Sequence, residues 1–138
     1  MERRGPAGRL TVLLDTHVWI WWAADPGRLS SRSAALIADA GTVLLASISC
    51  WEVAMLAAKG RIEFDRPVER WIRQALARPG LRSVPLSPAA ATAAGLLPGS
   101  FPGDPADRLI YATARAEGAE LLTRDRRLRD FDPRGTGW

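Results

Sequence analysis

Short apolar segments alternate along the chain with longer segments of helical composition. Four segments are predicted to be strands: LTVLL (10–14), TVLLAS (42–47), LRSVPL (81–86) and AELLT (119–123). The first two are almost wholly apolar, which is typical of strands that are buried on both faces. Strands that alternate with helices in this way predict an α/β fold, with a parallel sheet covered by helices on both faces.

The clearest helical pattern lies between the second and third predicted strands. In RPVERWIRQALARPG (66–80), apolar side chains recur at 68, 71, 72, 75 and 76, and Pro67 suits the first helical position. Other helices are expected after the first strand as far as DPG (25–27), and over 30–41, 48–60, 87–97 and 105–117. DFDPRGTGW (130–138) has poor strand composition, so a fifth strand is left open.

The length and composition indicate one globular unit. A chain of 138 residues suits a single domain over 10–138, preceded by a short flexible N-terminus over 1–9. With 47% hydrophobic residues the chain is too apolar for intrinsic disorder, and no apolar run is long enough for a membrane span. The single cysteine, Cys50, excludes an internal disulfide framework and fits a cytoplasmic protein.

The chain is basic, with a net charge of +4 that arginine carries almost alone, because Lys59 is the only lysine. The guanidinium group suits phosphate, which favours a nucleic-acid partner. An arginine-rich and alanine-rich composition can also reflect the genome, so charge alone leaves both interpretations open.

Acidic residues fall where the predicted strands end. Asp15 directly follows the first strand, Glu52 lies in the turn after the second, Asp104 and Asp107 open the helix over 105–117, and Asp125 follows the last strand. Ligands of a parallel sheet bind at the carboxyl ends of its strands. We therefore expect these five side chains to meet in one crevice.

Taken one at a time, these acids also fit ordinary structural roles as helix caps or surface ion pairs. Caps would be formed by Asp15, by Ser49 with Glu52 in the S-x-x-E spacing of a capping box, and by Asp104 with Asp107, while Asp125 would pair with Arg124, Arg126 or Arg127. Together, however, four or five carboxylates in one crevice repel one another, and a cation must hold them.

Oxygen ligands without a set of histidines and cysteines favour Mg²⁺ or Mn²⁺ over zinc. A metal at these acids in a basic chain suits hydrolysis of a phosphodiester. The arginines that flank Asp125, which are Arg124, Arg126, Arg127 and Arg129, would form either a phosphate-holding rim or a solvated basic loop.

Four segments resemble the successive acidic motifs of the PIN-domain ribonucleases, specifically the VapC-type toxins of bacterial type II toxin–antitoxin systems. They are LLDTHVWIWW, SISCWEVAMLAAKGRI, GDPADRLIYATA and LLTRD, in the family's order and spacing over residues 10–130. The resemblance implies a three-layer α/β/α sandwich around a parallel sheet and Mg²⁺ or Mn²⁺ as cofactor. It also implies a cellular RNA substrate, a homodimer and a tightly bound VapB-type antitoxin.

The resemblance assigns roles to individual residues. Asp15, Glu52, Asp107 and Asp125 would be the catalytic, metal-binding quartet, with Asp104 as an additional acid at the rim and Thr123 orienting Asp125. Arg108, Arg124, Arg126 and Arg127 are the candidate RNA-binding residues. Related sequences often carry a histidine shortly before the DPADR segment, where this chain has FPG, so no histidine is assigned a role there.

Three other residues near these motifs call for simpler interpretations. His17 is expected to be a helix residue close to the site rather than a general base, and Cys50 a small buried side chain. Trp21 lies off the helical face that carries Trp19 and Trp22, which places part of this cluster at an interface or, alternatively, against stacked bases.

The acidic residues together with the resemblance therefore predict a metal-dependent endoribonuclease toxin, in which an activated water attacks the phosphodiester and leaves a 5′-phosphate. The alternatives are a metal-dependent DNA nuclease or phosphatase, and a non-catalytic PIN-like binding module. A phosphatase of the aspartyl-phosphate class would need a second acid two residues after Asp15, where His17 stands.

Overall fold

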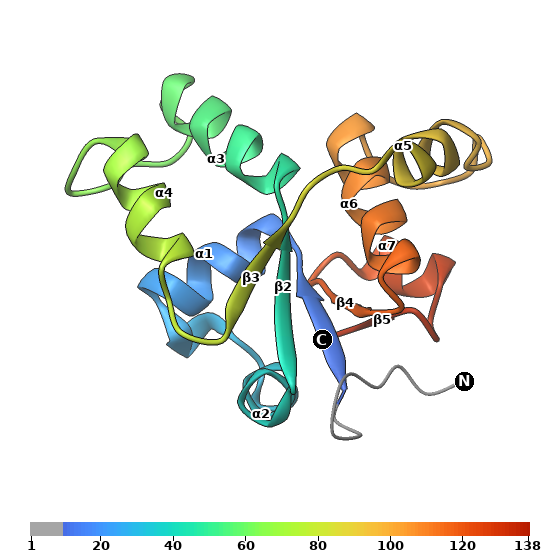
Figure 1. Cartoon of the computed structure of the whole chain (residues 1–138), viewed down its shortest axis with the longest axis horizontal. Helices are drawn as coiled ribbons and strands as arrows, with labels where there is room; N and C mark the ends of the chain where they lie inside the picture. The colour runs from blue at the N-terminus through green and yellow to red at the C-terminus, as the bar shows by residue number, and fades with distance from the viewer. Residues whose placement is uncertain (1–9) are drawn as a thin grey trace.

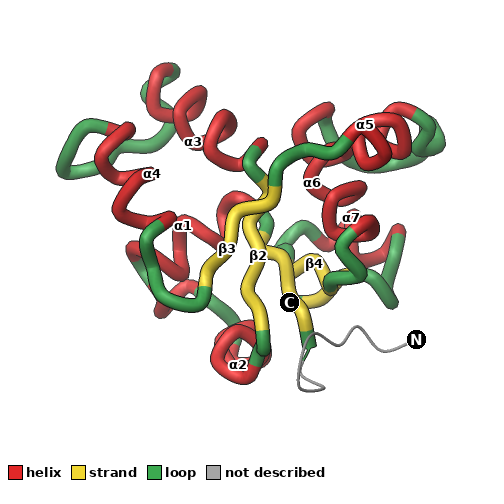
Figure 2. The backbone as a smooth tube through the Cα atoms, viewed as in Figure 1, coloured by secondary structure: helices red, strands yellow, loops and turns green. Residues whose placement is uncertain are grey.

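A five-stranded parallel sheet forms the middle of the molecule in the computed structural model, which describes residues 10–138 (Figures 1 and 2). The prediction for residues 1–9 lies outside the described residues. The strands are β1 (Thr11–Leu14), β2 (Thr42–Ala46), β3 (Leu81–Val84), β4 (Glu120–Leu122) and β5 (Thr136–Gly137), arranged in the order β3-β2-β1-β4-β5.

Helices cover both faces of the sheet, which confirms the predicted three-layer α/β/α sandwich. One side carries α1 (Thr16–Ala24), the short 3₁₀ helix η2 (Pro26–Arg28), α2 (Ser31–Asp39), α3 (Ile48–Ala58) and α4 (Val68–Leu76). The other side carries α5 (Pro88–Gly95), α6 (Pro105–Ala116) and α7 (Arg126–Phe131). Within residues 10–138, no helix has the length and apolar character needed to cross a membrane.

The apolar runs form strands because both of their faces are buried. Val12 and Leu14 of β1 pack against α1, α2 and α4, whereas Leu13 faces α6. Leu13 pairs in register with Leu44 of β2 and Leu121 of β4, so one row of leucines crosses the three central strands. Burying each of these side chains contributes about 1.5–3 kcal/mol, which is why short strands suffice here.

The structure corrects one helix end and answers the question of the C-terminus, which the sequence left open. Pro67 takes the N-cap position of α4 rather than its first helical position. The C-terminal segment forms a strand despite its poor strand composition, because β5 pairs with β4 at Leu121–Thr136 and Leu122–Gly137. It is preceded by α7, which the sequence did not predict and in which Leu128 is the one buried side chain.

The order of the strands creates a crevice at the carboxyl ends of β1 and β4. After β1 the chain forms β2, which pairs with one edge of β1. It returns later to form β4, which pairs with the other edge of β1. The loops that follow β1 and β4 therefore diverge to opposite faces of the sheet, and the space between them is where parallel sheets bind ligands.

Candidate active site

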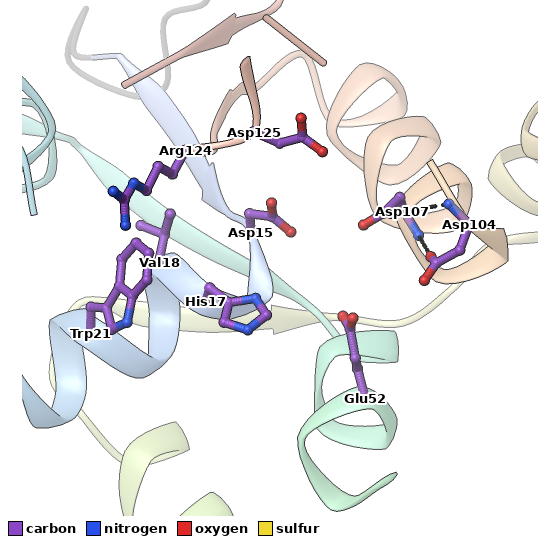
Figure 3. A pocket seen from close by; sticks show the side chains of 9 residues that line it. All are labelled: Asp15, His17, Val18, Trp21, Glu52, Asp104, Asp107, Arg124 and Asp125. Atoms are coloured by element: carbon purple, nitrogen blue, oxygen red, sulfur yellow. Dashed lines mark hydrogen bonds between the residues drawn. The ribbon is translucent and has the colours of Figure 1, made fainter. Parts of the chain in front are cut away.

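A pocket of about 470 Å³ opens at this crevice and is lined mainly by acids. Five carboxylates surround it, from Asp15, Glu52, Asp104, Asp107 and Asp125, and the rest of its wall comes from His17, Val18, Trp21 and Arg124 (Figure 3). The structure thus brings together the predicted quartet and Asp104, although these residues come from four separate parts of the chain.

Both carboxylate oxygens of Asp15 are held by hydrogen bonds. It ends β1 and caps α1, where its Oδ1 accepts a hydrogen bond from Thr16 N at 2.9 Å and its Oδ2 accepts one from the buried Thr123 hydroxyl at 2.7 Å. Thr123 Oγ1 also accepts a bond from Asp125 N at 3.1 Å, so Thr123 joins the two loops of the crevice. Burial raises the pKa of Asp15 above its ordinary value.

Glu52 is held by a buried hydroxyl that the sequence analysis missed. Thr16 Oγ1 donates to Glu52 Oε1 at 2.6 Å and lies 2.8 Å from Ser49 Oγ. A hydroxyl has one hydrogen, so Ser49 must be the donor to Thr16. Ser49 therefore does not form the predicted capping box with Glu52, because α3 begins at Ile48, too early for that cap.

The sequence contains signals for Thr16 and Ser49, but they are ambiguous. Thr16 directly follows Asp15 in the sequence, and Ser49 lies one helical turn before Glu52. The two segments are 33 positions apart in the chain at their hydroxyl contact, so only the fold could show that they meet. Burial raises the pKa of Glu52, and the negative charges of Asp15 and Asp104 raise it further.

Asp104 and Asp107 form the predicted cap at the start of α6. Asp107 N donates to Asp104 Oδ1 at 3.0 Å, and Asp104 N donates to Asp107 Oδ2 at 3.1 Å. Gly103 precedes them because a side chain there would collide with Asp107 and Phe101. Burial, followed by the negative charges of Asp15 and Asp104, raises the pKa of Asp107 to about 7.

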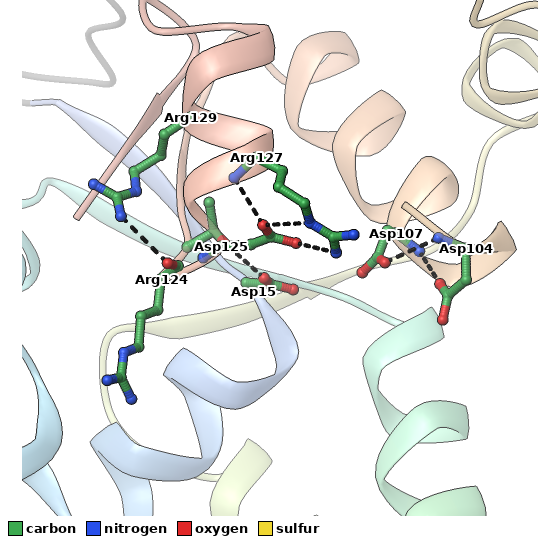
Figure 4. A network of polar contacts seen from close by, with 8 residues as sticks. Asp15, Asp104, Asp107, Arg124, Asp125, Arg127 and Arg129 are labelled. Atoms are coloured by element: carbon green, nitrogen blue, oxygen red, sulfur yellow. Dashed lines mark hydrogen bonds and ion pairs between the residues drawn. The ribbon is translucent and has the colours of Figure 1, made fainter. Parts of the chain in front are cut away.

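Asp125 differs from the other acids because a cation already accompanies it (Figure 4). Its Oδ1 accepts from Arg127 N at 2.9 Å, and its Oδ2 lies 3.1 Å from Arg127 Nη2. The hydrogen bond from the Arg127 side chain lowers the pKa of Asp125 below its ordinary value. Asp125 therefore pairs with one of the predicted arginines, and it also caps α7, a role that the sequence did not predict.

The acids line one pocket but are not gathered around one point. Within residues 10–138, no three Asp, Glu, His or Cys side chains form a ready-made metal cluster. Each quartet member instead accepts from a nearby donor, namely Thr123 and Thr16 for Asp15, Thr16 for Glu52, Asp104 N for Asp107 and Arg127 for Asp125. Like charges that lack a shared cation are expected to separate in this way.

The chemistry of the lining still suits a metal ion. Its donors are carboxylate oxygens, and the raised pKa values of Asp107 and Glu52 result partly from mutual repulsion that a cation would relieve. Oxygen ligands fit hard divalent cations such as Mg²⁺ and Mn²⁺ better than zinc.

The four candidate arginines occupy different surroundings. Arg124 lines the pocket. The other three contact other groups of the protein. Arg108 donates to the carbonyls of Ala94, Leu97 and Pro98. Arg126 lies 4.0 Å from Asp130, and Arg127 forms an ion pair with Asp125. Of the four, only Arg124 therefore lies in the pocket wall, and its guanidinium group forms no ion pair with a carboxylate of residues 10–138.

Trp21 does not lie away from the core as expected. It is 8% exposed, because the rings of His17 and Trp138 and two guanidinium groups pack against it. The exposed tryptophan is instead Trp51 on α3, which is 55% exposed. Cys50 is partly buried against the core, and His17 is exposed at the pocket edge.

The comparisons with known proteins agree with this fold and site. The PIN domain family model matches residues 12–133. Ribonuclease VapC22 of Mycobacterium tuberculosis (strain ATCC 25618 / H37Rv) is 50% identical over 119 residues, which cover 86% of this chain and 90% of that protein. The chain belongs to the PIN-domain family, among the VapC ribonucleases.

Solved structures with the same architecture are also known. A toxin–antitoxin complex from Klebsiella pneumoniae contains a chain with a TM-score of 0.66 and 24% identity, covering 92% of this chain and 96% of that chain. VapBC2 from Rickettsia felis, bound to a DNA fragment from its promoter, has a TM-score of 0.64 and 17% identity, covering 93% and 98%. At these identities the likeness concerns the fold alone.

Proposed function

We propose that this PIN domain, over residues 10–138, is a metal-dependent endoribonuclease toxin that a VapB-type antitoxin neutralises. The observation that carries the proposal is the convergence of five carboxylates at the carboxyl ends of β1 and β4. A 50% identical relative is named a ribonuclease, and a structural neighbour is titled a toxin–antitoxin complex. We place the activity in the cytoplasm, with cellular RNA as substrate and a homodimer as the assembled form.

Asp15, Glu52, Asp107 and Asp125 are the residues that we propose to hold Mg²⁺ or Mn²⁺, with Asp104 as an additional acid at the rim. When bound, the divalent cation supplies a Lewis acid that activates water and offsets the charge of the phosphodiester. The protein's contribution is rigid placement, because Thr123 and Thr16 fix the orientations of Asp15 and Glu52.

In this proposal the protonation state of Asp107 controls whether the metal can bind. With a pKa of about 7 in the metal-free protein, it is partly protonated at neutral pH. Its proton must leave before all four carboxylates can act as ligands. Arg127 likewise must give up part of its contact with Asp125, so that loading the site replaces one cation by another.

The proposal is tested by incubating total cellular RNA with purified, antitoxin-free protein in Mn²⁺ or in EDTA and sequencing the new ends. Discrete cuts with 5′-phosphates are expected in Mn²⁺ alone. Asp15→Asn should lower the rate by at least about 100-fold, because even the loss of a residue that orients a metal ligand costs about 10–100-fold.

Asp130→Asn is the matched control, since Asp130 is an exposed aspartate on α7 outside the pocket. It should cleave at the parental rate. Intact RNA after incubation with folded, metal-loaded protein would favour the non-catalytic binding module. Cleavage of DNA but not RNA would favour the DNA nuclease, and release of phosphate from monoesters the phosphatase.

A further inference from the structure

Two arginines from distant segments lie against the same tryptophan at the edge of the acidic pocket. The Arg28 guanidinium carbon lies 4.7 Å from the centroid of the Trp21 ring, and that of Arg124 lies 5.7 Å from it. Arg28 ends η2, whereas Arg124 follows β4. We call Arg28 and Arg124, together with Trp21, the Trp21 clamp.

The tryptophan in this clamp has a fixed position. It belongs to α1, which is anchored at its start by Asp15, and its ring packs 5.8 Å from Trp138 and 6.0 Å from His17, centroid to centroid. Cation–π contact with a fixed ring limits the conformations open to each long side chain. The two guanidinium groups are therefore held at the surface with little freedom left to lose on binding a ligand.

Neither guanidinium in the clamp has a carboxylate partner among residues 10–138. This distinguishes them from Arg127, which is paired with Asp125, and from Arg126, which faces Asp130. Two positive charges beside a pocket of acids, without carboxylates of their own, are available for an anionic ligand.

The clamp also lies where the acidic pocket meets a second cavity. This cavity has a volume of about 570 Å³ and shares His17 and Trp21 with the acidic pocket, while Arg28 and Arg61 lie in its wall. In Figure 3, Arg124 and Trp21 lie across Asp15 from Asp104 and Asp107. Because Asp25 and Glu63 also line the second cavity, phosphate would be favoured at the shared wall rather than throughout it.

We propose that the Trp21 clamp is a phosphate subsite, in which Arg28 and Arg124 bind the RNA backbone beside the phosphodiester that is cut. This inference rests on the proposed ribonuclease function. The acids repel every phosphate except one that shares their metal, so a neighbouring phosphate needs cations of its own. One guanidinium group can donate two parallel N–H bonds to the oxygens of a phosphate. A single strand of RNA would then run from the acids across Trp21 towards the second cavity.

The first test measures binding without cleavage, using a fluorescein-labelled single-stranded RNA of about ten nucleotides in EDTA. The variant is Arg28→Ala with Arg124→Ala. Its matched control is Arg70→Ala with Arg73→Ala on α4, which removes the same two positive charges from exposed positions that line neither cavity. Circular dichroism and the urea midpoint check that both proteins are folded.

Fluorescence anisotropy over about 50 to 200 mM KCl gives Kd and its dependence on salt. Each phosphate contact on a single strand contributes about 0.7 to the slope of log K against log salt. The clamp variant should therefore lose about 1.4 from the slope and bind at least about tenfold more weakly at low salt, while the control keeps the parental slope. Equal slopes in the two double variants would overturn the proposal.

The second test separates the subsite from the cleavage activity. In Mn²⁺ the clamp variant should raise KM on the same RNA and leave kcat close to the parental value, because the subsite binds substrate and transition state alike. On a dinucleotide, which has one phosphodiester, the clamp variant should differ from the parent in kcat/KM by a smaller factor than on the longer RNA. A fall in kcat on both substrates would contradict a phosphate subsite.

The two proposals can fail separately. If the parent cuts no RNA, the ribonuclease proposal fails, and the salt dependence of binding still decides the subsite. If binding to RNA is unchanged but capture of a protein partner is weakened, the clamp serves that partner and the phosphate subsite is wrong.

Discussion

Thr16 shows how much of the site depends on one side chain that carries no charge. Its backbone N–H donates to Asp15, and its hydroxyl donates to Glu52 while accepting from Ser49. It therefore couples the end of β1 to the first turn of α3. The sequence predicted which acids converge, because strand ends can be read from apolar runs, but a contact between residues 36 positions apart depends on the packed fold.

Thr16→Val keeps the shape of this side chain and removes its hydroxyl. Ser49 then loses its acceptor inside the core and Glu52 loses its donor, so we expect a loss of about 1–3 kcal/mol in the free energy of unfolding. Cleavage should fall by about 10–100-fold, because Glu52 is no longer oriented. Urea unfolding and the RNA assay measure the two effects, and Thr16→Ser should restore both.

Thr92→Val is the matched control for this change. The Thr92 hydroxyl is exposed, donates to Pro88 O within α5, and does not line the pocket. Its loss should change stability by no more than about 0.5 kcal/mol and leave cleavage unaffected. Parental stability and rate in Thr16→Val would show that the hydroxyl neither supports Glu52 nor satisfies Ser49.

Among the elements, those with strong local patterns could be predicted and those held by distant contacts could not. The four predicted strands and the helices between them follow from apolar runs, glycines and caps. By contrast, α7 and β5 have little apolar surface, and β5 is two residues long. They form because Asp132, after α7, accepts from the Tyr111 hydroxyl at 2.7 Å and from Gly135 N at 2.9 Å, and lies 3.5 Å from Arg115 Nη1.

Gly135→Ala tests this account of β5. A methyl group at position 135 would collide with the Asp132 carboxylate, whose partners restrict any movement. We expect a loss of about 1–3 kcal/mol in the free energy of unfolding. Hydrogen exchange should also speed up at the amides of Leu121 and Thr123, which donate to the carbonyls of Gly135 and Gly137.

Gly95→Ala is the comparison for that substitution. Gly95 ends α5, and nothing lies within 4 Å of the position that its Cβ would take. Alanine there should be neutral or stabilise the protein by up to about 1 kcal/mol. If Gly135→Ala leaves the two strand amides as protected as they are in Gly95→Ala, the close contact with Asp132 does not control the pairing of β5.

At the scale of the whole molecule, acids gather in one pocket although the chain as a whole is basic. The chain has a net charge of +4, yet five acids and one arginine are among the residues that line the acidic pocket. Topology explains the acids, because parallel strands deliver their following residues to one edge of the sheet. The sequence could not show which arginines are engaged, since Arg108 and Arg127 differ from Arg28 and Arg124 through contacts made only in the folded chain.

This arrangement predicts opposite effects of pH on the stability of the metal-free protein and on the additional stability that a bound metal supplies. The raised pKa of Asp107, about 7, means that folding penalises its charged form. Its contribution to stability is therefore present at low pH and is lost as pH rises through about 7. The raised pKa values of Asp15 and Glu52 act in the same direction, so the metal-free protein should become less stable between pH 6 and pH 8.

Metal binding has the reverse dependence, because the ligands must be charged. Protonating Asp107 alone should weaken Mn²⁺ binding about tenfold from pH 8 to pH 6, which removes about 1.4 kcal/mol of the stabilisation at a fixed, saturating concentration. Urea unfolding with Mn²⁺ or EDTA at both pH values measures this.

Two variants test the assignment to Asp107. Asp107→Asn should flatten the decline in stability of the metal-free protein with pH. Asp130→Asn, which replaces an exposed aspartate on α7, should leave that decline unchanged. A gain from Mn²⁺ that is the same at both pH values, or that survives in Asp15→Asn, would mean that the metal binds elsewhere and that the acids of this pocket are not its ligands.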